Sequence, residues 1–484
     1  MSNFDFLVID IGSTYTKQRL FKNHKLVSSS QAPTTIDHVF KGIKKGQSLM
    51  LNSMGKDSES EIEADNVIAS SSAAGGLRMV AIGYMTRVTA KAAKEVAMNS
   101  GSKILEILSS EDPGEYKSQV LQEIDPDIIL LAGGTDGGNQ ESILENAKII
   151  RDSGVKATVV IAGNLNAQRK VAKLLKENGI HHIRVPNIMP TIHELKVKEA
   201  REVIHREFIK QITKAKGLKE IQQVITNDKI IPTPGSVLLA TELLARGTYN
   251  KKGVGNVIVV DLGGATTDVH SVIPKFEELD DEEKGLVVTN EKQVSYRTVE
   301  GNLGLRVSAV GIIDAVDPRS ILEKRELNTK ENLKKFENYC EMVEGKPSYI
   351  AKNDDEKLYD KLLAETAVEL ALKRHAGRIA TEEDAFKGFI PGIPMGRDLR
   401  PVDLIICVGG YFSHNSEKES KEIIRSALKE PGISLLPKKP RIITDMDYIL
   451  FAAGNILEVD KDYSMEVLTK YFIENQTLIG EDNE

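Results

Sequence analysis

Two segments far apart in the chain share an order of residue types that suits phosphate chemistry. Each starts with an aspartate that ends an apolar run, passes through glycine and closes on hydroxyl residues: Asp10-Ile-Gly-Ser-Thr-Tyr-Thr and Asp261-Leu-Gly-Gly-Ala-Thr-Thr-Asp268. Glycine has no Cβ, so backbone N–H groups can approach an oxygen closely. An aspartate at a strand end can hold Mg²⁺ through its bound waters. The pair therefore predicts a site for Mg²⁺ and a polyphosphate.

Each residue of the two segments has an expected role in that site. Asp10 and Asp261 are predicted to bind Mg²⁺ and to organise the attacking water, and Asp268 is a second catalytic candidate. Lys17 has two open interpretations, a phosphate contact or a solvated strand residue. In-line attack by water on a phosphate needs mainly positioning and charge neutralisation. The predicted phosphate-binding residues are Gly12, Ser13, Thr14, Gly263, Gly264, Thr266 and Thr267.

An ordinary hairpin turn is the competing explanation for either segment alone, because glycine-containing turns are common between strands. The two segments lie in similar strand contexts, and that coincidence favours the phosphate interpretation. The chain contains neither Gly-x-x-x-x-Gly-Lys-[Ser/Thr] nor Gly-x-Gly-x-x-Gly. A P-loop NTPase, a dinucleotide fold and a protein kinase are therefore disfavoured.

Short strands are expected to position both segments. The runs FDFLVID, KQRLF and KLVSSSQ predict an antiparallel meander, and NVIVVD with VHSVI predicts a second strand–turn–strand unit. From about residue 89 to 190, helix and strand patterns alternate, beginning with a helix over TAKAAKEVAMNSG, and predict βαβ units with a mostly parallel sheet. The other expected elements are a helix at about 192–216, an exposed loop at 275–295 and helices over 319–376.

Composition narrows the class of protein. The chain has 484 residues, 40% of them hydrophobic, which is enough for two or three domains with real cores. The net charge of −7 comes without a basic stripe, so no nucleic-acid partner is expected. No apolar run approaches the ~20 residues of a membrane span, and no signal peptide is visible. The two cysteines lack metal-ligand spacing, so we expect a cytoplasmic protein without a membrane association.

The motifs resemble those of the actin/Hsp70/sugar-kinase ATPase superfamily, in the order that the superfamily keeps. The resemblance implies ATP as the nucleotide, with Mg²⁺, and places Gly409 and Gly410 against the adenosine. Tyr411 departs from the smaller residue common at its position. The matching segments are a first phosphate loop at 10–17, a connecting helix at 232–247, a second phosphate loop at 261–268, an adenosine motif at 405–411 and a second connecting helix at 448–455.

Within that superfamily the chain resembles the MutL (GlmL-type) accessory proteins of glutamate mutase and related adenosylcobalamin enzymes. The resemblance rests on IDIGSTYTK, SSAAGGLRMVAIGY, LLAGGTDGGN, NIMPTIHELKVKEAR, VVDLGGATTDVHS and RTVEGNLGLR. It implies a chaperone that docks on an adenosylcobalamin-dependent mutase or aminomutase and uses ATP hydrolysis to expel damaged cobalamin. The sequence leaves open whether the chain is a monomer or a homodimer. A small-molecule kinase and a filament-forming actin-like ATPase are the alternatives.

The fold class expected from these features is α/β: a two-lobed actin-like ATPase with duplicated ribonuclease-H-like sheets, an inserted parallel βαβ block and a helical insertion. ATP is expected between the lobes. The expected division is a first lobe at 1–231 with the parallel block at about 89–190, a second lobe at 232–456 with the helical insertion at about 319–380, and a C-terminal helix with an acidic tail at 457–484.

Two further segments leave their roles open. The loop Gly133–Gly138 follows a predicted strand and precedes a helix, so it is either a small anion or partner site or a flexible connection. The segment Arg297–Arg306 either completes the nucleotide pocket or pairs Arg297 with Glu300 on a surface turn.

Overall fold

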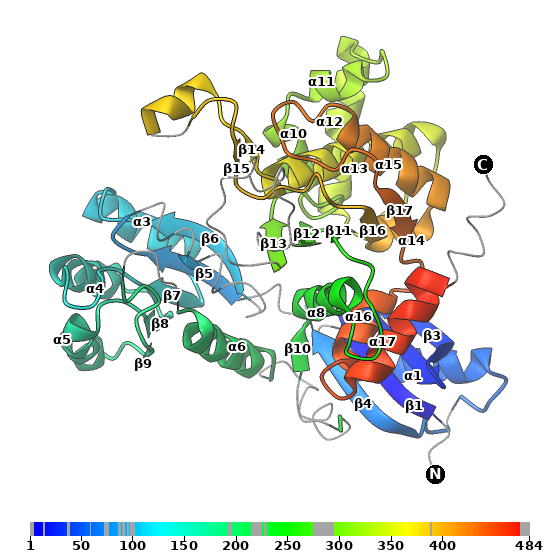
Figure 1. Cartoon of the computed structure of the whole chain (residues 1–484), viewed down its shortest axis with the longest axis horizontal. Helices are drawn as coiled ribbons and strands as arrows, with labels where there is room; N and C mark the ends of the chain where they lie inside the picture. The colour runs from blue at the N-terminus through cyan, green and yellow to red at the C-terminus, as the bar shows by residue number, and fades with distance from the viewer. Residues whose placement is uncertain are drawn as a thin grey trace. The chain divides into compact units, whose positions relative to one another are not determined.

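The computed structural model divides into two compact units, Met1–Ser236 and Val237–Glu484. Figure 1 shows the elements of both. The residues that the structure describes are 4–12, 15–35, 39–58, 60–71, 77–85, 89, 92–93, 96, 102–191, 196–213, 225–226, 230–273, 295–387 and 390–474.

The first unit contains a mixed sheet in which an antiparallel meander is extended on one side by parallel strands. Its strands are β1 (Phe4–Ile11), β2 (Tyr15–Lys22), β3 (Lys25–Pro33), β4 (Ala64–Ser71) and β10 (Ile230–Pro232), in the order β10-β4-β1-β2-β3. β1 lies in the centre and pairs with β2 and β4, and nearly all of its residues are buried, as its apolar run predicts. Helix α1 (Val39–Ser53) contacts β2 and β3.

A second sheet in the same unit is wholly parallel, in the order β6-β5-β7-β8-β9. Alternate residues of its strands enter different cores: Val80 and Ile82 pack with α3–α5, whereas Met79 and Ala81 pack with α6. The sheet confirms the expected βαβ block and includes β5, which precedes residue 89. Its elements are β5 (Leu77–Ile82), β6 (Ser102–Leu108), β7 (Ile128–Leu131), β8 (Thr158–Ile161), β9 (His182–Arg184), α3 (Gly114–Ile124), α4 (Glu141–Ser153), α5 (Leu165–Glu177) and α6 (Lys198–Thr213).

The second unit repeats the mixed sheet of the first. Its order is β13-β12-β11-β16-β17, with β11, β12 and β13 antiparallel and β16 and β17 parallel to β11. The strands are β11 (Val257–Leu262), β12 (Thr267–Val272), β13 (Ser295–Glu300), β16 (Leu404–Val408) and β17 (Arg441–Thr444). Counted along the chain, the five strands of each mixed sheet have the order 3-2-1-4-5, which is the ribonuclease-H-like arrangement. The predicted actin-like fold class is thereby confirmed.

Helices between β13 and β16 form the expected helical insertion. They are α10 (Ala309–Ala315), α11 (Pro318–Glu323), α12 (Lys330–Gly345) and α13 (Asp354–His375). α13 begins where Asn353 accepts a hydrogen bond from Glu356 N, and it carries acidic residues in its first turn and basic residues in its last, which suits the helix dipole. Its buried face packs on β11, β12 and β13. The insertion is therefore anchored directly on the central sheet of the second unit.

The remaining helices of the chain complete the two units. α8 begins at Thr233, near the end of the first unit, and most of its residues belong to the second. α16 matches the expected second connecting helix. A two-stranded ribbon follows the helical insertion, with β14 and β15 as its strands. These elements are α8 (Thr233–Arg246), β14 (Arg378–Ile379), η2 (Glu382–Lys387), β15 (Pro394–Met395), α14 (Gly410–His414), α15 (Glu417–Lys429), α16 (Ile449–Ile456), α17 (Lys461–Thr469) and η3 (Lys470–Glu474).

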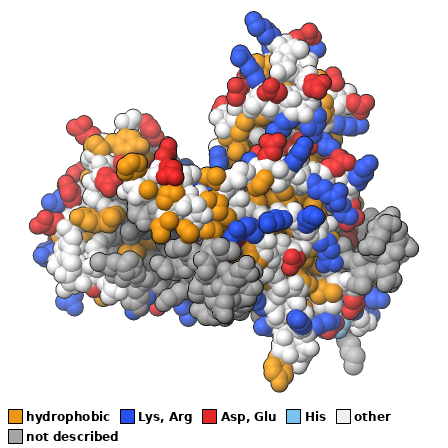
Figure 2. Space-filling model, turned by 45° about the horizontal axis from the view of Figure 1, so that its top comes forward, with side chains coloured by type: hydrophobic (Ala, Val, Ile, Leu, Met, Phe, Trp, Pro, Cys, Tyr) orange, Lys and Arg blue, Asp and Glu red, His pale blue; other side chains and the backbone are white. Residues whose placement is uncertain are grey.

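Several elements predicted from the sequence begin at other residues or lie outside the described residues. The helix expected at 192–216 is α6, which begins at Lys198. Most of the helix expected from residue 89, nearly all of the loop at 275–295 and the acidic tail lie outside the described residues. No helix within the described ranges has both the length and the apolarity to cross a membrane. Figure 2 shows both cationic and anionic side chains on the face drawn.

Candidate phosphate-binding loops

The two aspartate–glycine segments form equivalent hairpins, one in each unit. In the first, Asp10 pairs with Lys17 across β1 and β2, and in the second Asp261 pairs with Asp268 across β11 and β12. Each turn is closed by one backbone bond of the same kind, Gly12 N to Tyr15 O at 3.0 Å and Gly263 N to Thr266 O at 2.9 Å. The predicted repetition of one local design is therefore present down to the register of the strands.

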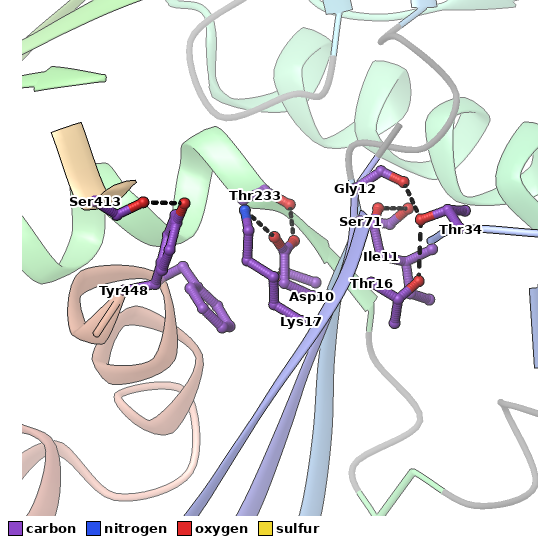
Figure 3. Close-up of polar contacts among 12 residues, drawn as sticks. Asp10, Ile11, Gly12, Thr16, Lys17, Thr34, Ser71, Thr233, Ser413 and Tyr448 are labelled. Atoms are coloured by element: carbon purple, nitrogen blue, oxygen red, sulfur yellow. Dashed lines mark hydrogen bonds and ion pairs between the residues drawn. The ribbon is translucent and has the colours of Figure 1, made fainter. Parts of the chain in front are cut away.

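Asp10 is buried, and its carboxylate is held by hydroxyl groups from two distant segments. Thr233 Oγ1, at the start of α8, donates to Oδ1 at 2.5 Å, and Ser70 Oγ on β4 donates to the same oxygen at 3.1 Å. Lys17 Nζ lies 3.8 Å from Oδ2, so the other oxygen faces a cation (Figure 3). These contacts fix the orientation of the carboxylate at the strand end.

The backbone next to Asp10 is held just as closely. Ser71 Oγ donates to Ile11 O at 3.2 Å, and Thr34 Oγ1 donates to Gly12 O at 2.9 Å (Figure 3). A Cβ on Gly12 would lie 2.5 Å from Tyr15 O, so only glycine fits this turn. Ser13 and Thr14, two of the predicted phosphate donors, lie outside the described residues.

The second loop holds its second carboxylate by a buried ion pair. Arg297 Nε and Nη2 donate to Asp268 Oδ1 at 2.9 and 2.7 Å, and Thr266 Oγ1 donates to Oδ2 at 3.0 Å. Thr267 is fully buried, and its hydroxyl donates to Leu303 O at 2.5 Å. The Thr267 hydroxyl could bind phosphate only if this hydrogen bond were broken. Gly264, by contrast, is exposed at the tip of the turn.

The predicted adenosine motif lies directly against the second loop. Gly409 has φ 112°, and a Cβ there would lie 3.0 Å from Asp261 Oδ1, so β16 ends within contact of that aspartate. Gly410 is exposed and starts the short helix α14. The Tyr411 side chain packs on the core of the unit, and its hydroxyl donates to Glu419 Oε1 at 2.6 Å. Burial, with that carboxylate, raises the pKa of Tyr411.

Sequence reasoning missed the side chains that hold the aspartates. Thr233 and Ser70 are not among the residues predicted for the site, and one of the two interpretations of Arg297 pairs it with Glu300. In the structure Glu300 pairs instead with Arg374 at 2.6 Å, so the surface-turn interpretation of Arg297 is wrong. The sequence signal for these supporting residues was that each is a polar residue close to the end of a strand. Many strands have such a residue, so the signal does not identify a site.

Replacing Arg297 by methionine is expected to destabilise the second unit, because both members of its ion pair with Asp268 are 9% exposed. Loss of one partner leaves a buried charge uncompensated, which costs about 3 kcal/mol in the free energy of unfolding. Arg374→Met breaks a more exposed pair and should cost less than about 1 kcal/mol. Urea unfolding of both variants measures the difference, and equal losses would contradict a structural role for the Arg297 pair.

Two buried histidines lie beneath the second loop. His375 bonds Ser271 Oγ at 2.7 Å and Thr298 Oγ1 at 2.8 Å, whereas neither ring nitrogen of His270 has a hydrogen-bond partner in the described structure. Burial, followed by the charge of the nearby Arg297, lowers the pKa of His270 to about 3, although Asp268 acts in the opposite direction. His270 is thus a neutral packed side chain and not a base.

Acid is expected to destabilise the chain through His270. Between the unfolded pKa near 6.5 and the folded value of about 3, the unfolded chain binds a proton that the native chain does not. The free energy of unfolding therefore falls by about 1.4 kcal/mol per pH unit as the pH drops through this window. His270→Leu removes the proton and the unpaired nitrogens, so at pH 5 it should gain about 2 kcal/mol over the native chain. Urea unfolding at pH 7.5 and pH 5 tests this, and a pH-independent difference would refute it.

The loop Gly133–Gly138 is cross-linked to its neighbours. Asp136 Oδ1 accepts from Leu165 N and from Asn187 Nδ2, both at 2.9 Å. Asn164, which is fully buried, donates to Gly138 O at 3.1 Å. These bonds join the loops after β7, β8 and β9 and give this loop a structural role at the carboxyl end of the parallel sheet.

The residues of both hairpins fit magnesium and a polyphosphate. Each strand end presents one carboxylate beside a glycine turn, and Mg²⁺ commonly takes one or two carboxylates and keeps several waters. Over the described ranges there is no group of three or more His, Cys, Asp or Glu side chains that could hold a metal ion by themselves.

Comparison with known proteins gives matches that cover most of the chain. A family model described as MutL protein matches residues 6–472. Protein MutL of Clostridium tetanomorphum is 34% identical over 475 residues, which cover 97% of this chain and 99% of that protein. Among solved structures, nucleotide-free acetone carboxylase covers 87% of this chain and 68% of its own, with TM-score 0.41 and 12% identity. ROK hexokinase from Thermus thermophilus covers 94% and 98%, with TM-score 0.28 and 10% identity.

Proposed function

The chain belongs to the MutL protein family, and from that premise we propose that it is an ATP-dependent reactivating chaperone of an adenosylcobalamin-dependent mutase or aminomutase. In this proposal the chain hydrolyses ATP to ADP and phosphate and uses the change to release damaged cobalamin from its partner. The observation that carries the ATPase part is the duplicated hairpin, with a carboxylate at the same register position in each.

The chain's own residues would act by positioning the magnesium ion, the phosphates and the attacking water. Asp10 and Asp261 would hold the magnesium ion that accompanies ATP, and this ion would neutralise charge on the phosphates. The backbone N–H group of Gly264 would donate to a phosphate oxygen, and Gly12, whose own N–H closes its turn to Tyr15 O, would allow the phosphate to approach. Asp268, oriented by Arg297, would orient the attacking water. Gly409 and Gly410 would lie against the adenosine. Hydrolysis removes the γ-phosphate contacts, and loss of such contacts is a common source of conformational change.

The experiment has two stages, so that its parts can fail separately. Release of phosphate from ATP by the purified chain, with and without Mg²⁺, tests the ATPase. A glutamate mutase or aminomutase loaded with inactive hydroxocobalamin is then supplied with adenosylcobalamin, the chain and either ATP or a non-hydrolysable analogue. Recovery of mutase activity only with ATP supports the chaperone. ATP turnover without recovery of any such enzyme would reject the chaperone and keep the ATPase.

The two alternatives give different products in the same assays. Transfer of the γ-phosphate to a sugar or a carboxylic acid, in place of free phosphate, would identify a small-molecule kinase. Sedimentation of the chain with ATP would identify a filament. Neither alternative has a specific observation in its favour among the contacts of the described residues.

A further inference from the structure

The segment between β13 and α10 contacts the second phosphate loop along its whole turn. Leu305 N donates to Gly263 O at 3.2 Å, and the N–H groups of Arg306 and Val307 donate to Gly264 O at 2.9 and 2.7 Å. Ser308 Oγ donates to Ala265 O at 2.9 Å. Three successive carbonyl groups of the turn are therefore held by one adjoining segment.

A glycine makes this close approach possible. A Cβ on Gly304 would lie 2.2 Å from the carbonyl carbon of Ala265 and 2.5 Å from its Cα. Any other residue there would push the segment and the turn apart. The sequence run GNLGLR thus has a physical reason for its second glycine, which is backbone contact with the phosphate loop.

Holding the carbonyls also sets the direction of the N–H groups. A peptide unit is planar and trans, so its N–H points opposite to its C=O. The bonds to Gly263 O and Gly264 O therefore aim the N–H groups of Gly264 and Ala265 away from the 305–307 segment. Those N–H groups belong to the turn that is expected to bind phosphate.

Arg306 in turn is fixed by the helical insertion. Its Nη1 and Nη2 donate to Asp360 Oδ1 and Oδ2 on α13 at 2.9 and 2.8 Å, and its Nε donates to Tyr349 O at 3.0 Å. Tyr339 on α12 donates to Asp360 Oδ1 at 2.9 Å. The pair is largely buried, with side chains 17% and 8% exposed. A bidentate pair between an arginine and a carboxylate of this kind adds geometric specificity as well as energy.

We propose that Arg306 and Asp360 are positioning residues that set the second phosphate loop and couple it to α12 and α13. A nucleotide that moves the turn must move Leu305–Val307, and therefore Arg306 against α13. By reciprocity, a partner that shifts α13 must change the affinity of the turn for phosphate. This inference rests on the proposed ATPase, and it identifies the helical insertion as the element through which the ATPase and a partner protein would communicate.

Arg325 and Glu365 provide a matched control on the same helix. Arg325 Nη2 donates to both Glu365 oxygens at 2.7 and 2.9 Å, and the carboxylate is 2% exposed. Among the described residues, neither side chain forms a hydrogen bond with residues 263–265. Arg306→Met and Arg325→Met each leave one buried carboxylate without its arginine, so their losses in thermal stability should be similar. Only Arg306→Met should alter the phosphate loop. Arg306→Lys and Asp360→Asn provide milder variants in case the first fails to fold.

Amide hydrogen exchange of the full chain is the primary measurement. Without nucleotide, Arg306→Met should exchange faster than the native chain in peptides covering 262–268 and 303–308, and Arg325→Met should not. Adding Mg–ATP should change the exchange of α13 in the native chain and in Arg325→Met but not in Arg306→Met. The KM for ATP in Arg306→Met should rise about ten-fold with a smaller change in kcat, within the range of coupling energies seen along such networks.

Two results would overturn the proposal. One is equal exchange in 262–268 for the Arg306 and Arg325 variants, and the other is an unchanged response of α13 to Mg–ATP in Arg306→Met or Asp360→Asn. If the native chain binds no ATP, the proposed ATPase is wrong. The hydrogen-exchange comparison without nucleotide would still test whether the Arg306–Asp360 pair positions the second phosphate loop.

Discussion

Replacing Asp10 by asparagine is expected to lower ATP turnover about a hundredfold or more, the scale of losing one preorganised electrostatic group. The substitution keeps the shape of the side chain, and an amide oxygen can still accept the hydroxyl groups of Thr233 and Ser70. It removes the negative charge that is proposed to hold magnesium and that lies 3.8 Å from Lys17 Nζ. The expected result is therefore a folded chain with little phosphate release.

Asp5 provides the control on the same strand. Its Oδ2 accepts from Asn23 N at 2.6 Å at the opposite end of β1, so Asp5→Asn removes a carboxylate from β1 outside the phosphate loop. Phosphate release at saturating Mg–ATP should stay near the native rate in Asp5→Asn and fall in Asp10→Asn and Asp261→Asn. Thermal unfolding checks that all three variants fold. Turnover by Asp10→Asn within a factor of about two of the native rate would remove Asp10 from the catalytic site.

The hairpins could be predicted from the sequence because their determinants are local. An apolar run, an aspartate, a glycine turn and a β-branched continuation follow one another directly in the sequence, and the glycine restricts where the chain can reverse. Asp10 and Asp261 were placed at strand ends by this reasoning, and the structure has them there. The local patterns predicted only the meander of the first sheet and the strand–turn–strand unit of the second, and the complete duplicated sheets were expected only from the resemblance to the ATPase superfamily.

The supports of the site could not be predicted, because they join residues far apart in the chain. Thr233 reaches Asp10 across 223 positions, and Ser70 reaches it across 60. Both depend on the pairing of strands that are distant in the chain, and β10, which precedes Thr233, has three residues and carries no periodic pattern of its own. Arg297 is a similar case, since its sequence neighbour Glu300 offered a partner of opposite charge. The fold brings Asp268 within 2.7 Å on the adjoining strand instead.

Gly409→Ala is the other substitution from which a large effect is expected. Gly409 has φ 112° and ψ 166°, a conformation that is essentially restricted to glycine and that costs other residues about 1–3 kcal/mol. A Cβ would also lie 2.2 Å from Leu262 O, so the end of β11 has to move. The same Cβ would lie 3.0 Å from Asp261 Oδ1. The substitution should therefore destabilise the second unit and displace the carboxylate that is proposed to hold magnesium.

Gly345→Ala separates this effect from a general intolerance of alanine. Gly345 ends α12, and a Cβ there would meet no atom within 4 Å, so alanine should be neutral in stability and in ATP turnover. For Gly409→Ala we expect a lower urea midpoint and a loss of ATP affinity that exceeds what the lost stability explains, measured by titration at a temperature where the variant is folded. Because Gly409 contacts the backbone of β11 and the Asp261 carboxylate together, the two losses should appear together. A variant that loses stability but binds ATP as the native chain does would show that β16 supports the sheet without setting the position of Asp261.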